Sequence, residues 1–488
     1  MNDYLNKVDY KDIFKNFSEI SKIPRGSGNE SEISSFLMKF AKEHHLECIQ
    51  DEAKNVIIIK EAVKGYEKKP AIILQGHMDM VCEKRKSSTI DFSSDPIKLM
   101  IDGDYLHADG TTLGADDGIA VAYILSLLTD ETLKHPRIEA VLTTNEEVNM
   151  SGAKALDTSV LQGKFMINID SEEEGHLLCS SAGGTTGIIT IPVERLAEYG
   201  RKFRVSISGL KGGHSGMEIG KNRSNAIKLI GRLLFELKEL QSIGIIRVHG
   251  GFKDNVIPRE AAAELIIPSV YKENMTDEYK KARDSITELL EIYQKELSGS
   301  EPELSFFVED LEEGEFQILN PASSEKLLFL LVNIPHGVQV MSSEIDGLVE
   351  SSVNIGIADI EEDKIIINDS IRSSKTSYKH FLNKRIKNLA EYSGGQYTIC
   401  SEYPGWEYKK DSALREKCRK IYKELFDKEM VEEATHAGLE CGYMNEKIPD
   451  LDIVSIGPDI FDVHKIEEKI NIPSAVRVYQ FLEKIIMS

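Results

Sequence analysis

The sequence predicts an α/β protein in which a domain with a mixed, mainly parallel sheet is interrupted by an inserted α+β domain. Short apolar runs alternate with helical patterns in the first part of the chain, and this order is typical of a parallel sheet covered on both faces. The middle part changes to half-buried strands and amphipathic helices. The last part returns to the first style, so we place the domain boundaries at 1–184 plus 397–488 for the outer domain and at 185–396 for the inserted one.

The outer domain is predicted from apolar patterns of two periods. A helical spacing of apolar residues marks a helix at 30–43, and a continuous apolar stretch at 118–128 indicates a buried helix. Runs rich in Ile and Val are short enough to be buried strands. These strands are expected at 55–60, 71–74, 138–142, 165–169 and 452–456, with further helices at 412–425 and 474–486.

The inserted domain is predicted from a different mixture. An apolar stripe marks an amphipathic helix at 223–240, and alternation marks a half-buried strand at 203–208. Further helices are expected at 277–297, 323–332 and 378–392, and further strands at 245–248, 262–267, 304–308, 351–357, 364–368 and 396–400.

Composition and charge exclude several classes of protein. The chain has 488 residues, and at roughly 100–200 residues per domain it is expected to hold two or three domains. With 59 basic and 81 acidic side chains its net charge is −22, which argues against nucleic acid and anionic membranes as partners. We read no signal peptide and no membrane-spanning run. The six scattered cysteines form no CxxC pair, which argues against a disulfide framework and favours a cytoplasmic location.

Metal-binding types of side chain follow four of the predicted strands. In chain order these are His77 and Asp79, Glu146 and Glu147, Asp170, and His464, while Asp116 and Asp117 open the buried helix. Sites in open α/β sheets form beyond the carboxyl ends of the strands. A single acidic loop residue is usually just solvated. Histidines and carboxylates after four separate strands indicate a metal site.

Seven segments carry a family resemblance. They are LQGHMDMVCEK, TTLGADDGIAVA, TTNEEVNMSGA, NIDSEEEG, GLKGGHSG, THAGLECG and GPDIFDVH. In this order they resemble the aminoacyl-histidine (Xaa-His) dipeptidases, a branch of the co-catalytic zinc peptidases, over essentially the full length. The resemblance identifies the outer domain as a catalytic metallopeptidase domain and the inserted domain as a lid that binds substrate.

The resemblance implies a site for two metals. His77 and Asp170 would bind the first metal, Glu147 and His464 the second, and Asp116 would bridge both. Three carboxylates and two imidazoles suit two divalent ions, zinc first, with cobalt or manganese as alternatives.

Three further features follow from the same resemblance. Asp79 would orient His77 from behind, because such outer carboxylates fix the imidazole tautomer. Glu146 would be the general base, with a turn aiming it differently from Glu147. The Asp116–Asp117 peptide bond is expected to be cis. "HKIEEK" stands where the family more often has "HSPDEK", which removes no ligand.

The inserted domain is expected to contact the substrate. His214 in GGHSG resembles the lid histidine that donates to the oxyanion, although these glycines also fit a simple turn. Asn255 and Arg372 resemble the groups that grip the substrate carboxylate, and either could instead be a surface residue. His436 and Glu440 in THAGLECG are assigned to substrate binding. A metal role for His436 is left open, although His464 fits that position better.

The sequence therefore predicts a cytoplasmic, metal-dependent dipeptidase that cleaves dipeptides, including Xaa-His, by attack of a metal-bound hydroxide. A tripeptidase or an N-acyl amino acid deacylase of the same group is the enzymatic alternative. A binding protein without catalysis is the other, and the presence of Glu146 argues against it. The partners are small peptide substrates, without nucleic acid or membrane, and a homodimer is left open.

Overall fold

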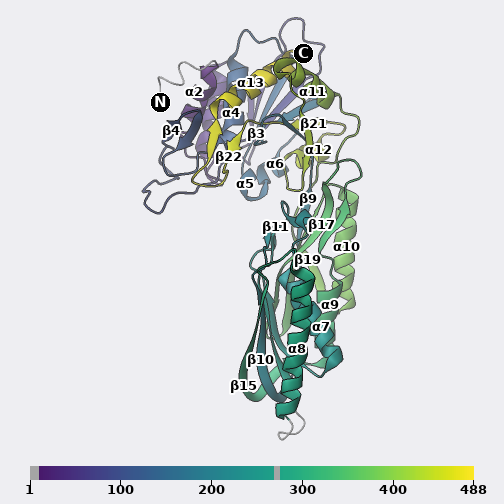
Figure 1. Cartoon of the computed structure of the whole chain (residues 1–488). Helices are drawn as coiled ribbons and strands as arrows, with labels where there is room; N and C mark the ends of the chain where they lie inside the picture. Colours follow the sequence, from purple (N-terminus) through teal and green to yellow (C-terminus); the bar gives the residue numbers. More distant parts are fainter. Residues whose placement is uncertain (1–9, 269–274) are drawn as a thin grey trace. The chain divides into compact units, whose positions relative to one another are not determined.

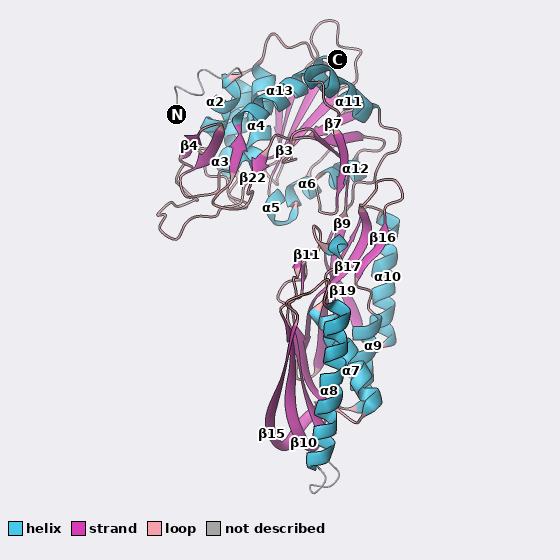
Figure 2. Cartoon of the chain, viewed as in Figure 1, coloured by secondary structure: helices cyan, strands magenta, loops and turns pink. Residues whose placement is uncertain are grey.

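The chain divides into two compact units. A computed structural model describes residues 10–268 and 275–488. Unit 1 consists of Met1–Ser180, Tyr408–Ala434 and Glu440–Ser488, and unit 2 of Ser181–Glu407 and Thr435–Leu439. Figure 1 follows the chain through both units, and Figure 2 shows their helices and strands.

Unit 1 is built on a mixed sheet with a parallel centre. The strand order is β1-β2-β6-β3-β7-β21-β8-β20, and the four strands from β6 to β21 run parallel. Every residue of β6 and β3 is buried, as expected of strands covered on both faces. The central strands are β6 (Ile138–Thr143), β3 (Ile72–His77), β7 (Phe165–Asn168) and β21 (Asp452–Ser455), and the outer ones are β1 (Glu47–Gln50), β2 (Val56–Lys60), β8 (His176–Ser181) and β20 (Val431–Thr435). The predicted fold class is confirmed.

Within the described part of unit 1, five long helices share one apolar core with this sheet. They are α2 (Lys11–Ile20), α3 (Ser31–Glu43), α4 (Ala115–Thr129), α11 (Ala413–Phe426) and α13 (Ile472–Met487). The helix α4 packs against β3 and α2, and its apolar sequence is buried almost throughout. Shorter elements are α5 (Glu146–Asn149), α6 (Ser151–Ala155), α12 (Cys441–Lys447) and a small sheet of β22 (Ile460–Phe461), β23 (Lys469–Asn471), β5 (Tyr105–Ala108) and β4 (Leu99–Asp102).

Unit 2 contains one nine-stranded antiparallel sheet. Its order is β15-β10-β14-β12-β17-β18-β9-β19, with β16 paired to β17. These strands are β15 (Ser305–Leu319), β10 (Arg195–Ser208), β14 (Ala261–Pro268), β12 (Gly244–Gly250), β17 (Val349–Ile360), β18 (Lys364–Ser373), β9 (Gly183–Pro192), β19 (Gln396–Tyr403) and β16 (Gly337–Met341). The predicted boundary at residue 397 falls inside β19, which pairs with β9 in this sheet.

One face of the unit 2 sheet packs on helices. These are α7 (Ala226–Leu240), α8 (Met275–Leu297), α9 (Pro321–Asn333) and α10 (Thr376–Tyr392). Phe203, Val205 and Ile207 of β10 lie in the apolar core with them. Because side chains alternate along a strand, the intervening residues face the other way. Two short strands, β11 (Gly213–His214) and β13 (Val256–Ile257), form a separate pair.

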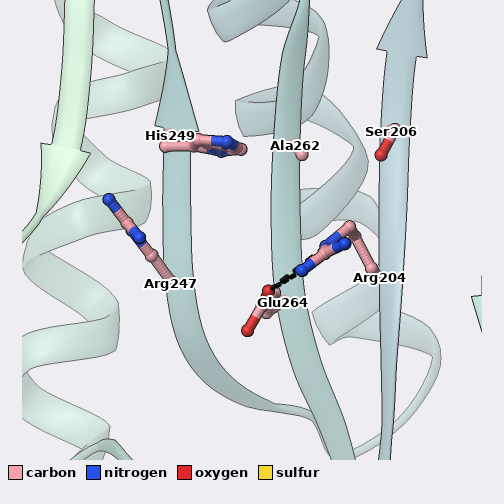
Figure 3. Close-up of a pocket in the computed structure, with 6 residues that line it drawn as sticks. All are labelled: Arg204, Ser206, Arg247, His249, Ala262 and Glu264. Carbon is pink, nitrogen blue, oxygen red and sulfur yellow. Dashed lines mark hydrogen bonds and ion pairs between the residues drawn. The ribbon is translucent and has the colours of Figure 1, made fainter. Parts of the chain in front are cut away.

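The opposite face of that sheet is polar and slightly hollow. A pocket of about 330 Å³ lies there. Figure 3 shows the residues that line it, which are Arg204, Ser206, Arg247, His249, Ala262 and Glu264. Its arginines are paired with carboxylates: Arg204 Nη2 lies 2.5 Å from Glu264 Oε1, and Arg247 Nη2 lies 2.8 Å from Asp359 Oδ2. We interpret this pocket as part of a solvated sheet surface on which arginines and carboxylates form ion pairs.

Candidate metal centre and substrate-facing cluster

The first group of metal-binding side chains gathers where β3 and β7 end. His77 is the last residue of β3, and Asp170 follows β7. The His77 Nε2 atom lies 3.2 Å from Asp116 Oδ1 and 3.5 Å from Asp170 Oδ1. The three ligand atoms lie within 4.8 Å of one another, so one ion could contact all three.

A second group shares Asp116 with the first. The other oxygen of this carboxylate, Oδ2, lies 3.1 Å from His464 Nε2, which is itself 2.8 Å from Glu147 Oε2. Asp116, Glu147 and His464 again fall within 4.8 Å. Each Asp116 oxygen therefore faces a different histidine, which is the arrangement that a carboxylate bridging two cations requires.

The charges of this cluster depend strongly on one another. Burial would raise the pKa of Asp116, but hydrogen bonds to His464 and His77 outweigh it and hold that pKa below its usual range. Hydrogen bonds to Asp116 and Glu147 raise the pKa of His464 to about 11. Burial would lower the pKa of His77, yet hydrogen bonds to Asp116, Asp170 and Asp79 raise it well above its ordinary value.

These ligands fit two divalent cations. The surrounding carboxylates favour the positively charged form of both imidazoles, and metal ions would supply positive charge at the same place. The Glu147 Oε1 atom is buried and has no hydrogen-bond partner among the residues that the structure describes. A buried carboxylate oxygen without a partner is costly, so it is suited to a metal. The mixed set of imidazoles and carboxylates is typical of zinc, cobalt or manganese sites.

Glu146 lies beside the ligands in a desolvated position. It forms a further group within 4.8 Å with His77 and Glu147. Burial raises its pKa well above the ordinary range of a glutamate. A carboxylate with a raised pKa is a better proton acceptor near neutral pH, which suits a general base.

Asp79 organises both sides of the site. Its Oδ1 atom lies 3.4 Å from His77 Nδ1 and accepts a 3.1 Å hydrogen bond from the backbone N–H of Glu146. Its Oδ2 atom accepts a 3.3 Å bond from the N–H of Glu147. The two glutamates lie in the first turn of the helix α5, whereas the sequence suggested a non-helical turn. Asp79 stabilises the start of this helix, because it accepts from backbone N–H groups that have no partner within the helix. The Asp116–Asp117 bond is cis, as expected.

Glu440 lies in unit 1 as a buried carboxylate. One of its oxygens, Oε2, accepts 2.5 Å hydrogen bonds from Gln75 Nε2 and Thr143 Oγ1. The other, Oε1, has no partner among the described residues. Burial raises its pKa to about 8.

The remaining predicted residues belong to unit 2. Arg372 is buried, and its Nη1 atom donates to Tyr403 Oη at 3.0 Å. His214 and Arg372 are neighbours, since a Cβ on Gly216 would lie 2.9 Å from the His214 ring and 3.2 Å from Arg372 Cζ. Burial and the charge of Arg372 together lower the pKa of His214.

His436 and Asn255 complete this cluster. His436 Nε2 lies 2.7 Å from Ser352 Oγ, and burial with the charge of Arg372 lowers the pKa of His436 to about 3. The backbone carbonyl of Asn255 accepts a 2.9 Å hydrogen bond from Ser215 N–H, next to His214. The structure thus brings His214, Asn255, Arg372 and His436 together within unit 2, and the metal-type residues together within unit 1.

The sequence of this chain matches a known protein family. A model of peptidase family M20/M25/M40 matches residues 73–488. The chain belongs to this family. The predicted kinship with co-catalytic metallopeptidases is confirmed.

Individual relatives of this M20 chain agree over its whole length. It is 33% identical over 484 residues to the cytosol non-specific dipeptidase of Escherichia coli, covering 99% of this chain and 98% of that one. The crystal structure of aminoacylhistidine dipeptidase from Vibrio alginolyticus matches with a TM-score of 0.92 and 33% identity, covering 100% and 99% of the two chains. Aminopeptidase PepT from Bacillus cereus shares the fold, with a TM-score of 0.55 and 15% identity over 98% of each chain.

Some residues that contact these clusters could not be recognised from the sequence. Tyr403 and Ser352 lie in ordinary strand sequence, and only contacts between segments far apart in the chain bring them to Arg372 and His436. Arg25, which donates to the backbone carbonyl of Asp79, and Glu468, which accepts from the backbone N–H of Asp116, were also missed, although Glu468 lies in the unusual "HKIEEK" segment. Within residues 10–268 and 275–488, no helix combines the length and apolar character needed to cross a membrane.

Proposed function

We propose that this M20 chain is a dipeptidase that uses two divalent metal ions, zinc first, to hydrolyse dipeptides, Xaa-His dipeptides among them. The observation that carries the proposal is the shared carboxylate of Asp116, whose two oxygens face His77 and His464. His77, Asp116 and Asp170 would hold one ion, and Asp116, Glu147 and His464 the other. The ions would polarise the scissile carbonyl and lower the pKa of the attacking water.

The chain's own residues would move the proton and fix the geometry. Glu146 accepts a proton from the attacking water and passes it to the leaving amine, for which its burial and raised pKa are suited. Asp79 holds His77 and the start of α5 in place together. The carboxylate of Asp79 would thereby fix the orientation of both the general base Glu146 and the metal ligand His77.

We assign unit 1 the catalytic role and unit 2 the lid and substrate-binding role. His214, whose pKa is lowered by burial and by the charge of Arg372, would donate a hydrogen bond to the developing oxyanion. Arg372 and Asn255 would bind the free carboxylate of the peptide, because a guanidinium matches a carboxylate in shape and charge. His436 would contribute to the peptide-binding surface. Glu440 is fully buried, so it would act only through Gln75 and Thr143, which donate to it. Arg372 and Asn255 would recognise the C-terminal carboxylate of the substrate while the metal site cleaves the peptide bond. The proposal therefore favours short peptides.

Location and partners follow the same proposal. The six cysteines are free, which suits the reducing cytoplasm in which we place the chain. The net charge of −22 gives no reason to expect a nucleic-acid partner.

A substrate panel tests the proposal. Purified protein with zinc or manganese is offered dipeptides, tripeptides and N-acetyl amino acids, and cleavage is followed for the wild type and for Glu146→Ala. We expect dipeptides to be cleaved fastest and the variant to be inactive. Faster cleavage of tripeptides or of N-acetyl amino acids would favour the corresponding alternative, and undiminished activity of the variant would rule out Glu146 as the base.

A further inference from the structure

A buried carboxylate faces the loop that carries the bridging Asp116. Glu468 is only 2% exposed. Its Oε2 atom accepts from the N–H groups of Leu113 and Gly114 at 2.7 and 2.9 Å, and its Oε1 atom from Ala115 and Asp116 at 2.7 and 3.3 Å. Four consecutive backbone donors therefore point at one side chain.

This arrangement joins two metal-binding segments. Glu468 lies four positions after His464, whereas the N–H groups that it accepts belong to the segment ending in Asp116. Asp116 and His464 are 3.1 Å apart and belong to the same candidate metal group. One carboxylate thus fixes the backbone of one ligand relative to the segment of the other.

A buried arginine holds the same loop from its other side. Arg25 is 2% exposed and donates to the carbonyls of Met78, Asp79 and Gly114 at 3.2, 3.1 and 2.5 Å. The first two carbonyls directly follow the ligand His77. Arg25 therefore links the His77 segment to the Asp116 loop, as Glu468 links that loop to the His464 segment.

The local sequence makes room for this arginine. A Cβ on Gly114 or on Gly118 would lie 2.5 Å from Arg25 Nη2. Gly114 also has a φ of +69°, a conformation that L side chains rarely adopt. Ser27, which lies two residues after Arg25, donates from its Oγ atom to Asp79 Oδ2 at 2.7 Å. The segment from Arg25 to Ser27 thus reaches the site at two points.

We propose that Glu468 and Arg25 are positioning residues that set the geometry of the two-metal site, with Ser27 assisting through Asp79. Neither charged group is a candidate ligand; each acts through the backbone of segments that carry ligands. The proposal rests on the metal site of the proposed function. Residues that orient ligands from behind typically contribute 10–100-fold to metal affinity.

The alternative is that these residues only stabilise the fold. A purely structural role would lower the melting temperature without changing the metal affinity of the protein that remains folded. Metal affinity, measured apart from activity, therefore distinguishes the two roles.

The experiment compares Glu468→Gln with Glu467→Gln. The glutamine at position 468 offers one acceptor oxygen to four donors, whereas Glu467 is an exposed neighbour of the same charge. Zn²⁺ is titrated into each apoprotein in competition with a chromophoric chelator, and the visible spectrum of the Co²⁺ form reports ligand geometry. We expect a 10–100-fold weaker affinity and an altered spectrum for Glu468→Gln, and wild-type behaviour for Glu467→Gln.

The outcomes separate this proposal from the proposed function. If the wild type binds no Zn²⁺, the metal site itself is wrong. If the wild type binds two ions and Glu468→Gln binds them within twofold of wild type with an unchanged spectrum, the positioning role is wrong. Arg25→Lys is the second variant. We expect the same loss, because the single ammonium of lysine cannot replace the two separate nitrogens, Nη1 and Nη2, with which Arg25 binds the two segments. Should neither variant fold, Ser27→Ala decides, and an unchanged Zn²⁺ affinity there overturns the proposal.

Discussion

Histidines in the two clusters carry opposite electrostatic shifts. In unit 1 the carboxylates around His77 and His464 raise the pKa of both imidazoles. In unit 2 burial and the charge of Arg372 lower the pKa of His214 and His436. The same side chain is therefore prepared for two tasks. The first pair lies among carboxylates, whose negative charge favours a cation there. The second pair is buried beside an arginine, whose positive charge disfavours protonation of these imidazoles.

Removing the proposed general base of unit 1, Glu146, should have the largest effect. Glu146→Gln keeps the size of the side chain but cannot accept the proton from water. We expect kcat to fall by about 10²–10⁴-fold, the range that general-base catalysis contributes. Zn²⁺ affinity should stay near the wild-type value, because Glu146 is not assigned as a ligand.

Steady-state kinetics and a metal titration on the same preparation check both halves of this prediction. The exposed Glu467→Gln is the matched control and should keep its activity. A Glu146→Gln protein that lost its Zn²⁺ affinity together with its turnover would show that Glu146 belongs to the ligand set.

Removing the arginine of unit 2 should have a smaller, substrate-dependent effect. Arg372→Met should lower kcat/KM for dipeptides with a free carboxylate by about 10–100-fold, since hydrogen bonds to charged groups contribute about 1.5–3 kcal/mol. Amidated dipeptides, which lack that charge, should be affected much less. Arg247→Met, on the polar sheet face in Figure 3, is the control within the same unit. Equal losses on both kinds of substrate would contradict the carboxylate-binding role.

The smallest effect concerns His436 and pH. Its pKa is about 3 in the folded chain, against an ordinary value of 6.5. As the pH falls below 6.5 the unfolded chain takes up a proton that folded His436 does not, so stability is lost between pH 6.5 and about 3. The slope for one such group approaches about 1.4 kcal/mol per pH unit.

His436→Gln should remove this contribution. Between pH 6.5 and pH 5 the wild type should lose about 2 kcal/mol more of its free energy of unfolding than the variant does. Urea unfolding at both pH values measures the difference, with the exposed His249→Gln as control. Parallel losses in the wild type and in His436→Gln would show that His436 titrates normally.

Much of the fold follows from sequence patterns. The apolar runs that lead to His77, Glu146 and Asp170 are three of the central parallel strands. Strands that are buried on both faces need continuous apolar sequence, so the polar candidate ligands come at or after the strand ends. The helix over 223–240 is α7, which begins at Ala226, where Asn225 accepts from the N–H groups of Ile227 and Lys228. Local periodicity and capping were sufficient for such elements.

Other features depend on long-range contacts that a single sequence does not reveal. The strand β9 is rich in glycine and resembles a loop, yet a Cβ on Gly184 or Gly187 would collide with the rings of Tyr403 or Tyr397 from the neighbouring strand. Aromatic rings replace the side chains that these glycines lack. In the same way, Glu468 gains its role only when its segment meets the Asp116 loop.

Zinc dependence tests the central claim most directly. The protein is stripped with a chelator, zinc is returned in known equivalents per chain, and hydrolysis of a dipeptide is measured at each step. The two-metal site built around Asp116 predicts no activity without metal and a rise that reaches its plateau at two equivalents. Full activity in the metal-free protein, or a plateau at one equivalent, would contradict it.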